Sequence, residues 1–425
     1  MRTIFIVSLL AVPIILVVLR QPLEESTITT GDRIQNAGYS YESYDIYTED
    51  GYGLTIFRVK NSTSTKAEGD SRSSTASPTA PVVLLMHGLS SSSDIWVIEG
   101  LSNPLVYDLV NQGYDVWLGN NRGNRYGNRH LNMTSNDRHF WSFSIHEIGT
   151  LDLPRIIDFI LEHTQQPSLH YVGYSQGTTV GFIMLSMRPE YNHKLKSISM
   201  LSPCVIMIHG SSPTRHLARF LGIYTPIHSY IGDSALFRPW IIRKLLGFEM
   251  CRSKDANAKI CSFIIFKLFG GYSAYLDESL LPDIFNTHPT TASAHQILHL
   301  MQFHHTKKFI QYNHGPEVNQ KRYNQSTPPE YNLSNINPRF PIHLFYSGYD
   351  EYIAPKDIAM LGKIMGNRTR EHFIDLENFS HIDFVWASNI KEVINRPLLD
   401  IINEAEMVLQ TEGKSPLKFD RKQQL

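Results

Sequence analysis

Short runs of mostly apolar residues alternate with segments of helical periodicity along most of the chain. The apolar runs have the length of buried strands and lie at residues 82–86, 114–118, 169–172, 197–201, 342–346 and 372–376. Helical segments lie between most of these runs, at residues 103–112, 153–163, 176–187 and 356–365, and a closing helix is expected at about residues 397–409. Strands that alternate with helices predict a mostly parallel sheet with helices on both faces, which is the α/β class.

Two segments depart from this alternation. Residues 44–59 consist of two β-rich runs joined by Asp50 and Gly51, which predicts an antiparallel hairpin. Between about residues 205 and 335 the strand pattern almost disappears, while prolines and aromatic residues are frequent. Because this stretch lies between two core strands, we expect an inserted, mainly helical cap over the C-terminal edge of the sheet, where α/β sheets bind ligands.

Composition supports a large folded body and removes several classes of function. Hydrophobic residues make up 42% of the 425 residues, which excludes global disorder. The 39 Lys and Arg residues balance 40 Asp and Glu residues, so binding to nucleic acid is not expected. Residues 60–80 are rich in Ser and Thr and predict a flexible loop, and residues 413–425 predict a polar, frayed tail. No stable protein partner is indicated.

The N-terminus predicts a secretory route. Arg2 precedes an apolar run from residue 4 to residue 19, which is shorter than the roughly 20 residues that span a bilayer, and Pro13 would kink a membrane helix. We therefore expect a signal peptide at residues 1–20, with an uncleaved anchor or a buried helix as alternatives. Six N-x-[ST] sequons favour an extracellular or lysosomal location; their asparagines are Asn61, Asn132, Asn324, Asn332, Asn367 and Asn378.

Cysteine and histidine spacings exclude the usual metal frameworks. Three cysteines are too few for a disulfide-dense scaffold or a four-thiolate zinc site. In an oxidising compartment Cys251 and Cys261 could close a small loop and leave Cys204 free, and three unpaired thiols are the alternative. His295 and His299 have the spacing of metal ligands on a helix, but the glutamate of H-E-x-x-H is missing. Because G-x-G-x-x-G and P-loop motifs are also absent from the sequence, no metal or cofactor is predicted.

A candidate nucleophile lies at Ser175. Residues 173–177 have the sequence Gly-Tyr-Ser-Gln-Gly, which matches G-x-S-x-G between a predicted strand and a predicted helix. Glycines at both ends permit the sharp turn that exposes the hydroxyl at a helix N-terminus, where an oxyanion is favoured. The alternative is a structural turn in which Ser175 only caps the helix.

The base and the acid of a Ser-Asp-His series are expected farther along the chain. Asp350 follows the strand at residues 342–346, and His381 lies in a loop after the strand at residues 372–376. Both positions are at the C-terminal edge of the sheet, so His381 could contact Ser175 with one ring nitrogen and Asp350 with the other. Asp383 is the rival acid, but it lies only two residues from His381 on the same loop.

Two backbone N–H groups are needed to bind the oxyanion. One is expected from Gln176, which follows the nucleophile. The other is expected from Leu89, because Gly88 allows a tight turn after the strand at residues 82–86. His87 is a conceivable second base, although a histidine before a glycine turn is more often structural.

The chain resembles the acid lipase family of α/β-hydrolases, which comprises the gastric and lysosomal lipases and their insect and fungal relatives. The matching segments are residues 47–52 (YTEDGY), 87–89 (HGL), 113–120 (GYDVWLGN), 122–124 (RGN), 140–144 (FWSFS), 152–154 (DLP), 175–179 (SQGTT), 328–331 (PPEY) and 381–386 (HIDFVW). The resemblance spans roughly residues 35–410. Tyr174 departs from it, because the family usually has histidine before the nucleophile.

The resemblance implies an α/β-hydrolase core at residues 35–205 and 335–410, and a cap with a mobile lid at residues 206–334. It implies a catalytic triad of Ser175, Asp350 and His381. The amides of Leu89 and Gln176 would form the oxyanion hole, and Cys251 would pair with Cys261.

The expected activity is hydrolysis of carboxylic esters of long-chain lipids, triacylglycerols or sterol esters, at a lipid–water interface. A long acyl chain needs a large apolar trough, and a lid would shield that trough from water. Residues 258–269 are apolar on most faces and carry two lysines, so they suit a lid segment, with a buried cap helix as the alternative. A short-chain esterase, an acyltransferase and a non-catalytic lipid-binding protein are the rival functions.

Overall fold

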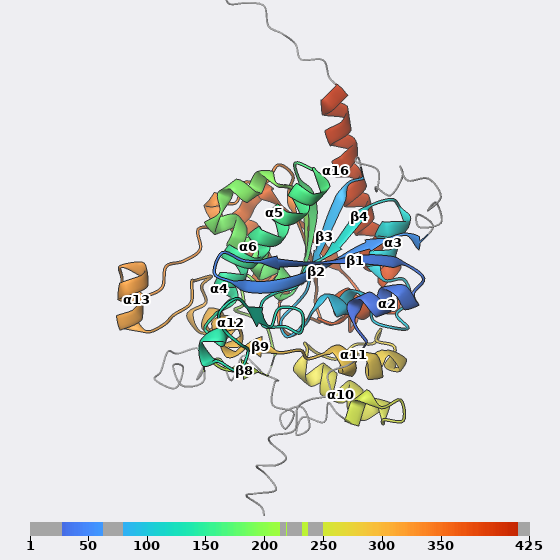
Figure 1. Ribbon diagram of the computed structural model, residues 1–425, viewed down its shortest axis with the longest axis horizontal. Coiled ribbons are helices and arrows are strands. Elements are labelled where there is room, and N and C mark those ends of the chain that lie inside the picture. Colours follow the sequence, from blue (N-terminus) through green and yellow to red (C-terminus); the bar gives the residue numbers. More distant parts are fainter. Residues whose placement is uncertain (1–27, 63–79, 213–217, 219–231, 237–249, 415–425) are drawn as a thin grey trace, which may run out of the picture.

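The computed structural model describes residues 28–62, 80–212, 218, 232–236 and 250–414 (Figure 1). The predicted signal peptide lies outside the described residues. So do most of the predicted loop at residues 60–80 and the end of the predicted tail, from residue 415 onward. Within the described residues, no helix has both the length and the apolar character needed to cross a bilayer.

One sheet of nine strands forms the centre of the described chain, in the order β1-β2-β4-β3-β6-β7-β10-β11, with β5 beside β2. The strands are β1 (Ser40–Tyr47), β2 (Tyr52–Lys60), β3 (Val82–Met86), β4 (Asp115–Leu118), β5 (Arg129–His130), β6 (Leu169–Tyr174), β7 (Leu195–Leu201), β10 (Ile342–Ser347) and β11 (Thr369–Ile374). From β4 to β11 all neighbours are parallel, and β1, β2 and β5 pair in antiparallel fashion. The predicted α/β class and the predicted hairpin are therefore confirmed.

Strands β2, β3, β4, β6, β7 and β10 each contribute to two hydrophobic cores, one on each face of the sheet. In β3, Val82, Leu84 and Met86 belong to one core, while Val83 and Leu85 belong to the other. This alternation follows from the two-residue period of a strand. The first core also contains apolar residues of α5 (Leu153–Thr164), α6 (Gln176–Met187) and α14 (Pro355–Met365). The second contains those of α2 (Thr30–Asn36), α3 (Leu105–Asn111) and α16 (Arg396–Lys414). The sheet is thus covered on both faces, as predicted.

The last strand and the last helix differ from their predicted bounds. The final strand, predicted at residues 372–376, begins at Thr369 and ends at Ile374. It is an edge strand whose first residues are polar and largely solvent-facing, so its start carries no apolar signal. The closing helix was predicted to end at residue 409, but α16 continues to Lys414, so the start of the predicted tail at residue 413 is wrong by two residues.

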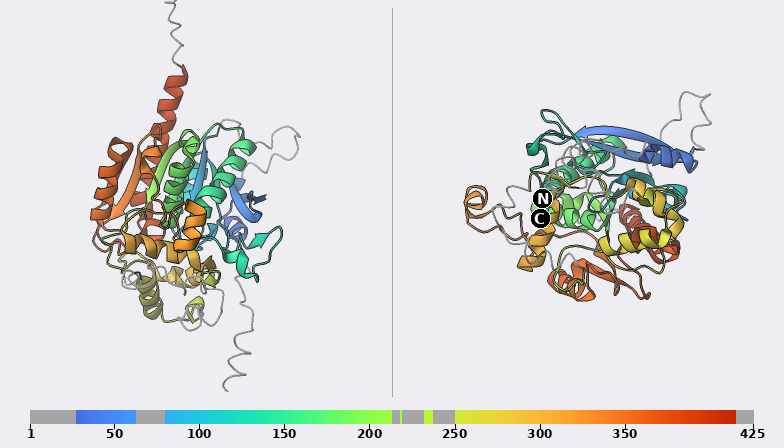
Figure 2. Two further views of the ribbon diagram at one scale, coloured as in Figure 1. Left: turned by 90° about the vertical axis from the view of Figure 1, so that its left-hand side faces the viewer. Right: turned by 90° about the horizontal axis from the view of Figure 1, so that it is seen from below.

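The described part of residues 206–334 is mainly helical and lies at one end of the sheet. It contains α10 (Ala258–Leu268), α11 (Leu281–Thr287), α12 (Ala294–Thr306), α13 (Pro316–Tyr323) and the short antiparallel pair β8 (Ala235–Leu236) and β9 (Ala292–Ser293). In Figures 1 and 2, α10, α11 and α12 gather below the strands, and α16 projects from the opposite end. Residues between two core strands therefore cover one end of the sheet.

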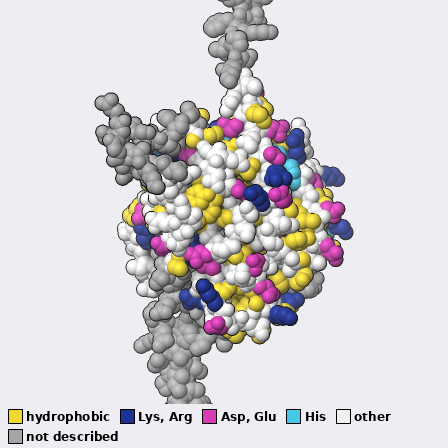
Figure 3. All heavy atoms as spheres, turned by 90° about the vertical axis from the view of Figure 1, so that its right-hand side faces the viewer, with side chains coloured by type: hydrophobic (Ala, Val, Ile, Leu, Met, Phe, Trp, Pro, Cys, Tyr) yellow, Lys and Arg dark blue, Asp and Glu magenta, His cyan; other side chains and the backbone are white. Residues whose placement is uncertain are grey.

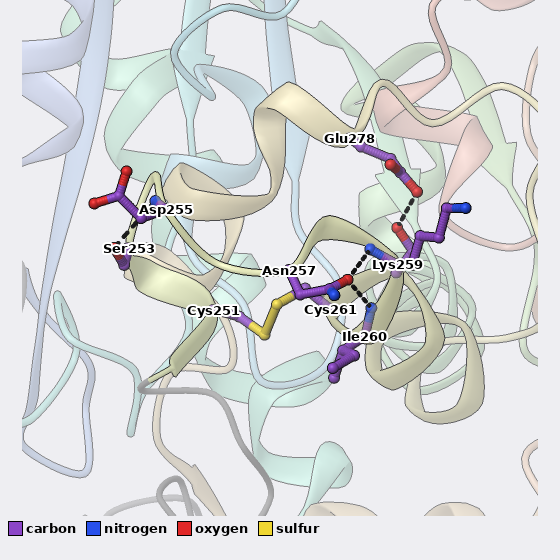
Figure 4. Close-up of a disulfide and its surroundings, with 9 residues drawn as sticks. Cys251, Ser253, Asp255, Asn257, Lys259, Ile260, Cys261 and Glu278 are labelled. Carbon is purple, nitrogen blue, oxygen red and sulfur yellow. Dashed lines mark hydrogen bonds between the residues drawn. A yellow bond between two sulfur atoms is a disulfide. The ribbon is translucent and has the colours of Figure 1, made fainter.

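Helix α10 is fastened at its start. Cys251 and Cys261 form a disulfide with a Cα–Cα distance of 5.6 Å (Figure 4). Cys204 is a buried free thiol. The Asn257 side chain caps the helix by accepting hydrogen bonds from the backbone N–H groups of Lys259 and Ile260, at 3.1 and 3.3 Å. The cross-link and the cap together fix where the helix begins.

Candidate active site

Ser175 occupies a sharp turn between β6 and α6. Its φ of 52° and ψ of −117° are unfavourable for a residue with a side chain, and its N–H donates to Leu201 O at 3.0 Å. The turn depends on two glycines. A Cβ at Gly177 would lie 2.5 Å from Met86 O, and one at Gly173 would lie 2.8 Å from the Gly177 carbonyl carbon. The backbone therefore packs too closely for any other residue and presents the Ser175 hydroxyl at the start of α6.

His381 lies within hydrogen-bond distance of the candidate nucleophile. Its Nε2 is 2.9 Å from Ser175 Oγ, although the two residues are 206 positions apart. The Tyr174 hydroxyl donates to His381 O at 3.0 Å, and burial raises the pKa of Tyr174, so this donor keeps its proton. Tyr174, the residue that departs from the resembled family, therefore links the nucleophile turn to the histidine loop.

Asp350 contacts the other ring nitrogen of His381. Asp350 Oδ2 lies 2.8 Å from His381 Nδ1, and Oδ1 accepts the backbone N–H groups of Tyr352 and Ile353 at 2.8 and 3.2 Å. The two backbone donors fix the rotation of the carboxylate. A carboxylate at Nδ1 favours a proton on that nitrogen, which leaves Nε2 as the acceptor that faces Ser175.

Asp383, the rival acid, has other partners. Its Oδ1 accepts from the Ser273 hydroxyl and its Oδ2 from Ser380 N, both at 2.6 Å. Burial raises its pKa to about 7. The carboxyl group therefore braces the loop that carries His381.

The segment after β3 lies against the nucleophile. A Cβ at Gly88 would lie 3.2 Å from Ser175 Cβ, so the backbone passes close to the reacting hydroxyl. Leu89 lines the cavity in front of Ser175, and Gln176 is the first residue of α6, whose N–H has no partner inside the helix. The geometry is compatible with the predicted oxyanion donors.

His87 has a structural environment. It is buried, its Nδ1 lies 2.8 Å from Gly88 O, and its Nε2 accepts from Asn121 N at 3.2 Å. Burial lowers the pKa of His87 to about 4, so the ring is neutral near pH 7. Both nitrogens are used inside the protein, which favours the structural alternative over a second base.

An apolar cavity of about 230 Å³ opens in front of Ser175. The sheet edge supplies Ser175, His381 and Leu89 to its wall. The inserted residues also line the cavity and contribute Met207, Leu268, Phe269, His288, Ile297, Leu300, Met301 and His304. The Ser175 hydroxyl therefore lies at a mostly apolar cavity, which suits apolar groups of a substrate.

Two groups near the nucleophile were missed by the sequence analysis. Ser202 Oγ lies 2.5 Å from Asp350 Oδ2 and 2.8 Å from His381 Nδ1. Cys204 Sγ lies 3.8 Å from Ser175 Oγ, and burial raises the pKa of this thiol. The available signal was position, because both residues follow the predicted strand at residues 197–201 and therefore lie at the same edge as the triad candidates.

The two histidines with metal-ligand spacing have protein partners. His295 Nε2 contacts Asp233 Oδ1 at 2.9 Å, and its Nδ1 contacts the Tyr312 hydroxyl at 2.7 Å. His299 Nε2 donates to Ile310 O at 2.9 Å. Among the described residues, no group of three potential ligands could hold a metal ion.

Buried histidines predict that acid destabilises the fold. Burial lowers the pKa of His87 to about 4, and those of His288 and His299 to about 3, from the usual 6.5 of a histidine. The unfolded chain therefore binds more protons than the folded one below about pH 6.5, and stability is lost as the pH falls toward 4. One pKa unit corresponds to about 1.4 kcal/mol, so each histidine should lower the free energy of unfolding by about 1–3 kcal/mol between pH 7 and pH 4.5. The raised pKa values of Asp383 and Asp152 oppose this trend, and the lowered pKa of Glu147 reinforces it.

Denaturant titrations between pH 7 and pH 4.5 would test this. The free energy of unfolding should decrease over the range, and His299→Gln should reduce the slope because an amide can still donate to Ile310 O without taking up a proton. A free energy that stays constant or rises toward pH 4.5 would contradict the prediction.

Comparisons with known proteins place the chain in a family. A family model described as the alpha/beta hydrolase fold matches residues 81–385, and one described as a partial alpha/beta-hydrolase lipase region matches residues 22–100. Lipase 3 of Drosophila melanogaster is 37% identical over 86% of this chain and 90% of its own length. Lipase 1 of the same organism is 33% identical over 90% of this chain and 81% of its own length. Gastric triacylglycerol lipase of Homo sapiens is 32% identical over 89% of this chain and 92% of its own length. The predicted family is therefore confirmed: the chain belongs to the α/β-hydrolase lipases.

Proposed function

We propose that this chain hydrolyses carboxylic esters of long-chain lipids, with triacylglycerols or sterol esters as substrates and Ser175, His381 and Asp350 as the catalytic triad. The observation that carries the proposal is the chain of contacts from Asp350 through His381 to Ser175, which ends at the apolar cavity. The names of the relatives, lipase and gastric triacylglycerol lipase, support the same reaction.

Acylation begins at the hydrogen bond between Ser175 and His381. Ser175 Oγ attacks the ester carbonyl carbon while its proton moves to His381 Nε2. Asp350 holds the Nδ1 proton and stabilises the positive charge that appears on the ring. His381 then gives the proton from Nε2 to the leaving alcohol oxygen, and the acyl group stays on Ser175. A water molecule then attacks the acyl carbon while its proton moves to His381 Nε2. His381 returns that proton to Ser175 Oγ, and the fatty acid is released.

The oxyanion of each tetrahedral intermediate would be bound by the N–H groups of Leu89 and Gln176. Charge at this position also lies at the N-terminus of α6, where the helix dipole is favourable. Preorganised donors in a water-excluding site stabilise the transition state more than the neutral ester, and this difference lowers the barrier.

The surface near the cavity suits a lipid–water interface. On α10, Cys261, Ser262 and Ile265 are buried, whereas Phe263 is 61% exposed and Ile260 is 46% exposed. The helix is therefore buried on one face and exposed on another, so it is not the fully buried cap helix that was the alternative to a lid segment. Leu268, at the end of α10, is itself 37% exposed and also lines the cavity. We infer that this face contacts the lipid surface and leads the acyl chain inward.

Charged side chains on one face of the molecule are evenly distributed. On the face drawn in Figure 3, basic and acidic side chains are interspersed with hydrophobic ones, and neither sign forms a continuous patch. This distribution agrees with the even balance of charges in the sequence, and this face offers no continuous basic patch to a polyanion.

A secretory location is part of the proposal. Asn61, Asn132, Asn324, Asn332 and Asn367 are solvent-exposed, as glycosylation requires, whereas Asn378 is only partly exposed. A disulfide between Cys251 and Cys261 is likewise suited to an oxidising compartment, either outside the cell or in the lysosomal lumen.

A substrate panel with two matched variants tests the function. We expect faster hydrolysis of an emulsified long-chain triacylglycerol or sterol ester than of a soluble short-chain ester. Replacing both Ile260 and Phe263 with Ser should lower only the emulsion rate, by about tenfold, because two exposed apolar side chains that the lipid surface would bury are removed. Replacing both Met407 and Val408 with Ser, on exposed sites of α16 at the opposite end, is the control.

The outcomes separate the rival functions. Activity restricted to soluble short-chain esters would identify an esterase, and transfer of the acyl group to an added alcohol in preference to water would identify an acyltransferase. Absence of any hydrolysis, together with no labelling of Ser175 by a fluorophosphonate, would indicate a lipid-binding protein.

A further inference from the structure

Ser202 contacts two of the three triad candidates. It follows the last residue of β7, and none of its surface is exposed. Its hydroxyl donates to Asp350 Oδ2 at 2.5 Å, and Ser202 Oγ also lies 2.8 Å from His381 Nδ1. Asp350 Oδ2 is also the atom that contacts His381 Nδ1, so three polar atoms form a closed triangle.

The backbone around Ser202 is held on both sides. Ser202 N donates to Phe345 O at 2.9 Å, which joins it to the strand that precedes Asp350. The preceding residue, Leu201, accepts from Ser175 N at 3.0 Å. On the other side, the Thr179 hydroxyl donates to Cys204 O at 2.8 Å. Ser202 itself has a φ of 52°, in the left-handed region that residues with side chains rarely adopt. An unfavourable conformation that the surroundings hold in place is typical of a functional position.

We propose that Ser202 is a positioning residue for ester hydrolysis, acting through Asp350 and His381. This inference rests on the proposed triad. The hydroxyl proton goes to Asp350 Oδ2 and fixes the oxygen that faces the histidine. The lone pairs of Ser202 Oγ then point toward the Nδ1 proton, which is shared between Asp350 and Ser202. When Nε2 receives the Ser175 proton, the imidazolium has two acceptors at Nδ1, and the ring stays in line with Ser175.

Two substitutions separate the hydroxyl from the backbone strain. Ser202→Ala and Ser202→Gly both remove the hydroxyl, but only glycine adopts a φ of 52° without strain. If the hydroxyl positions His381, both variants should lose kcat equally, by about 10- to 100-fold, because a hydrogen bond to a charged group is removed. KM should change little. The Gly variant should be at least as stable as the Ala variant in thermal unfolding.

Ser199→Ala is the matched control. Ser199 lies on the same strand and is also buried, but its hydroxyl has no hydrogen-bond partner in the described structure. Its loss should leave kcat unchanged. Pre-steady-state release of p-nitrophenol from an activated ester gives the acylation and deacylation rates separately. In the Ser202 variants both rates should fall by similar factors, because both steps place positive charge on His381.

Three results would overturn the proposal. The first is wild-type kcat in both Ser202 variants. The second is a loss in the Ala variant that the Gly variant restores, because strain would then explain it. The third is an equal loss in Ser199→Ala. Ser175→Ala is measured in parallel. If it remains active, the proposed triad fails, whereas an inactive Ser175→Ala beside an active Ser202→Ala refutes only the role of Ser202.

Discussion

Ser175→Ala should lower kcat for ester hydrolysis by about 10^4-fold or more while the protein stays folded. The substitution removes the atom that forms the acyl-enzyme, and no partial function of the other triad members replaces it. The fold should survive because, among the described residues, the Ser175 hydroxyl makes a hydrogen bond only to His381 and a long contact to Cys204. The backbone strain at this position is the same for alanine, so the unfolding free energy should change by less than about 1 kcal/mol.

Two measurements check the loss. Initial rates on an emulsified long-chain ester give kcat, and a fluorophosphonate probe counts reactive serines, which should fall from about one per chain to none. Thermal unfolding shows whether the variant is intact. Hydrolysis that persists near the wild-type rate would mean that another nucleophile acts. Cys204 is the nearest candidate, although burial raises its pKa and keeps it as a neutral thiol.

The parts of the fold with strong local signals were predictable from the sequence. The strand at residues 82–86 and the helix at residues 176–187 have the predicted bounds, because β3 is buried on both faces and α6 follows a glycine turn and ends before Pro189. The edge strand β11 was misplaced because its exposed start is polar. Apolar periodicity reports burial, and an edge strand has little of it.

The candidate site was predictable where sequence order and strand ends are enough. Ser175, Asp350 and His381 each follow a predicted strand, and parallel strands bring those ends to one edge. The cavity wall was not predictable residue by residue, since Leu300 and Met301 of α12 have the same pattern as an ordinary core helix. Ser202 was missed for a different reason. Its position depends on a left-handed backbone conformation, which a serine in the sequence does not predict.

The two candidate acids can be separated by one matched pair of substitutions. Asp350→Asn should lower kcat by about 10^3- to 10^4-fold, whereas Asp383→Asn should change kcat by less than about threefold. The difference follows from hydrogen-bond direction. Asp350 Oδ1 accepts two backbone N–H groups, so the oxygen of the introduced amide would keep that side, and its NH2 group would face His381 Nδ1.

An NH2 group at Nδ1 forces that nitrogen to accept a hydrogen bond. The ring proton must then lie on Nε2, where it faces Ser175 and blocks transfer of the serine proton. The stabilising negative charge beside the imidazolium is lost as well. At position 383 the acid braces a loop, and its pKa of about 7 means that a neutral group already occurs there near neutral pH. An amide should therefore mainly reduce the free energy of unfolding, by about 1–3 kcal/mol. The Ser273 hydroxyl and the Ser380 N–H both donate to the carboxylate, and an amide has an oxygen atom for only one of them.

Rates on a soluble activated ester, chemical denaturation and fluorophosphonate labelling distinguish the two effects in both variants. Labelling should slow in Asp350→Asn in proportion to kcat, since it depends on the same proton transfer, and should stay fast in Asp383→Asn. The opposite ranking, with activity lost at position 383 and kept at position 350, would assign the acid to Asp383. That result would require His381 to turn its Nδ1 away from an oxygen atom that lies 2.8 Å from it in the structure.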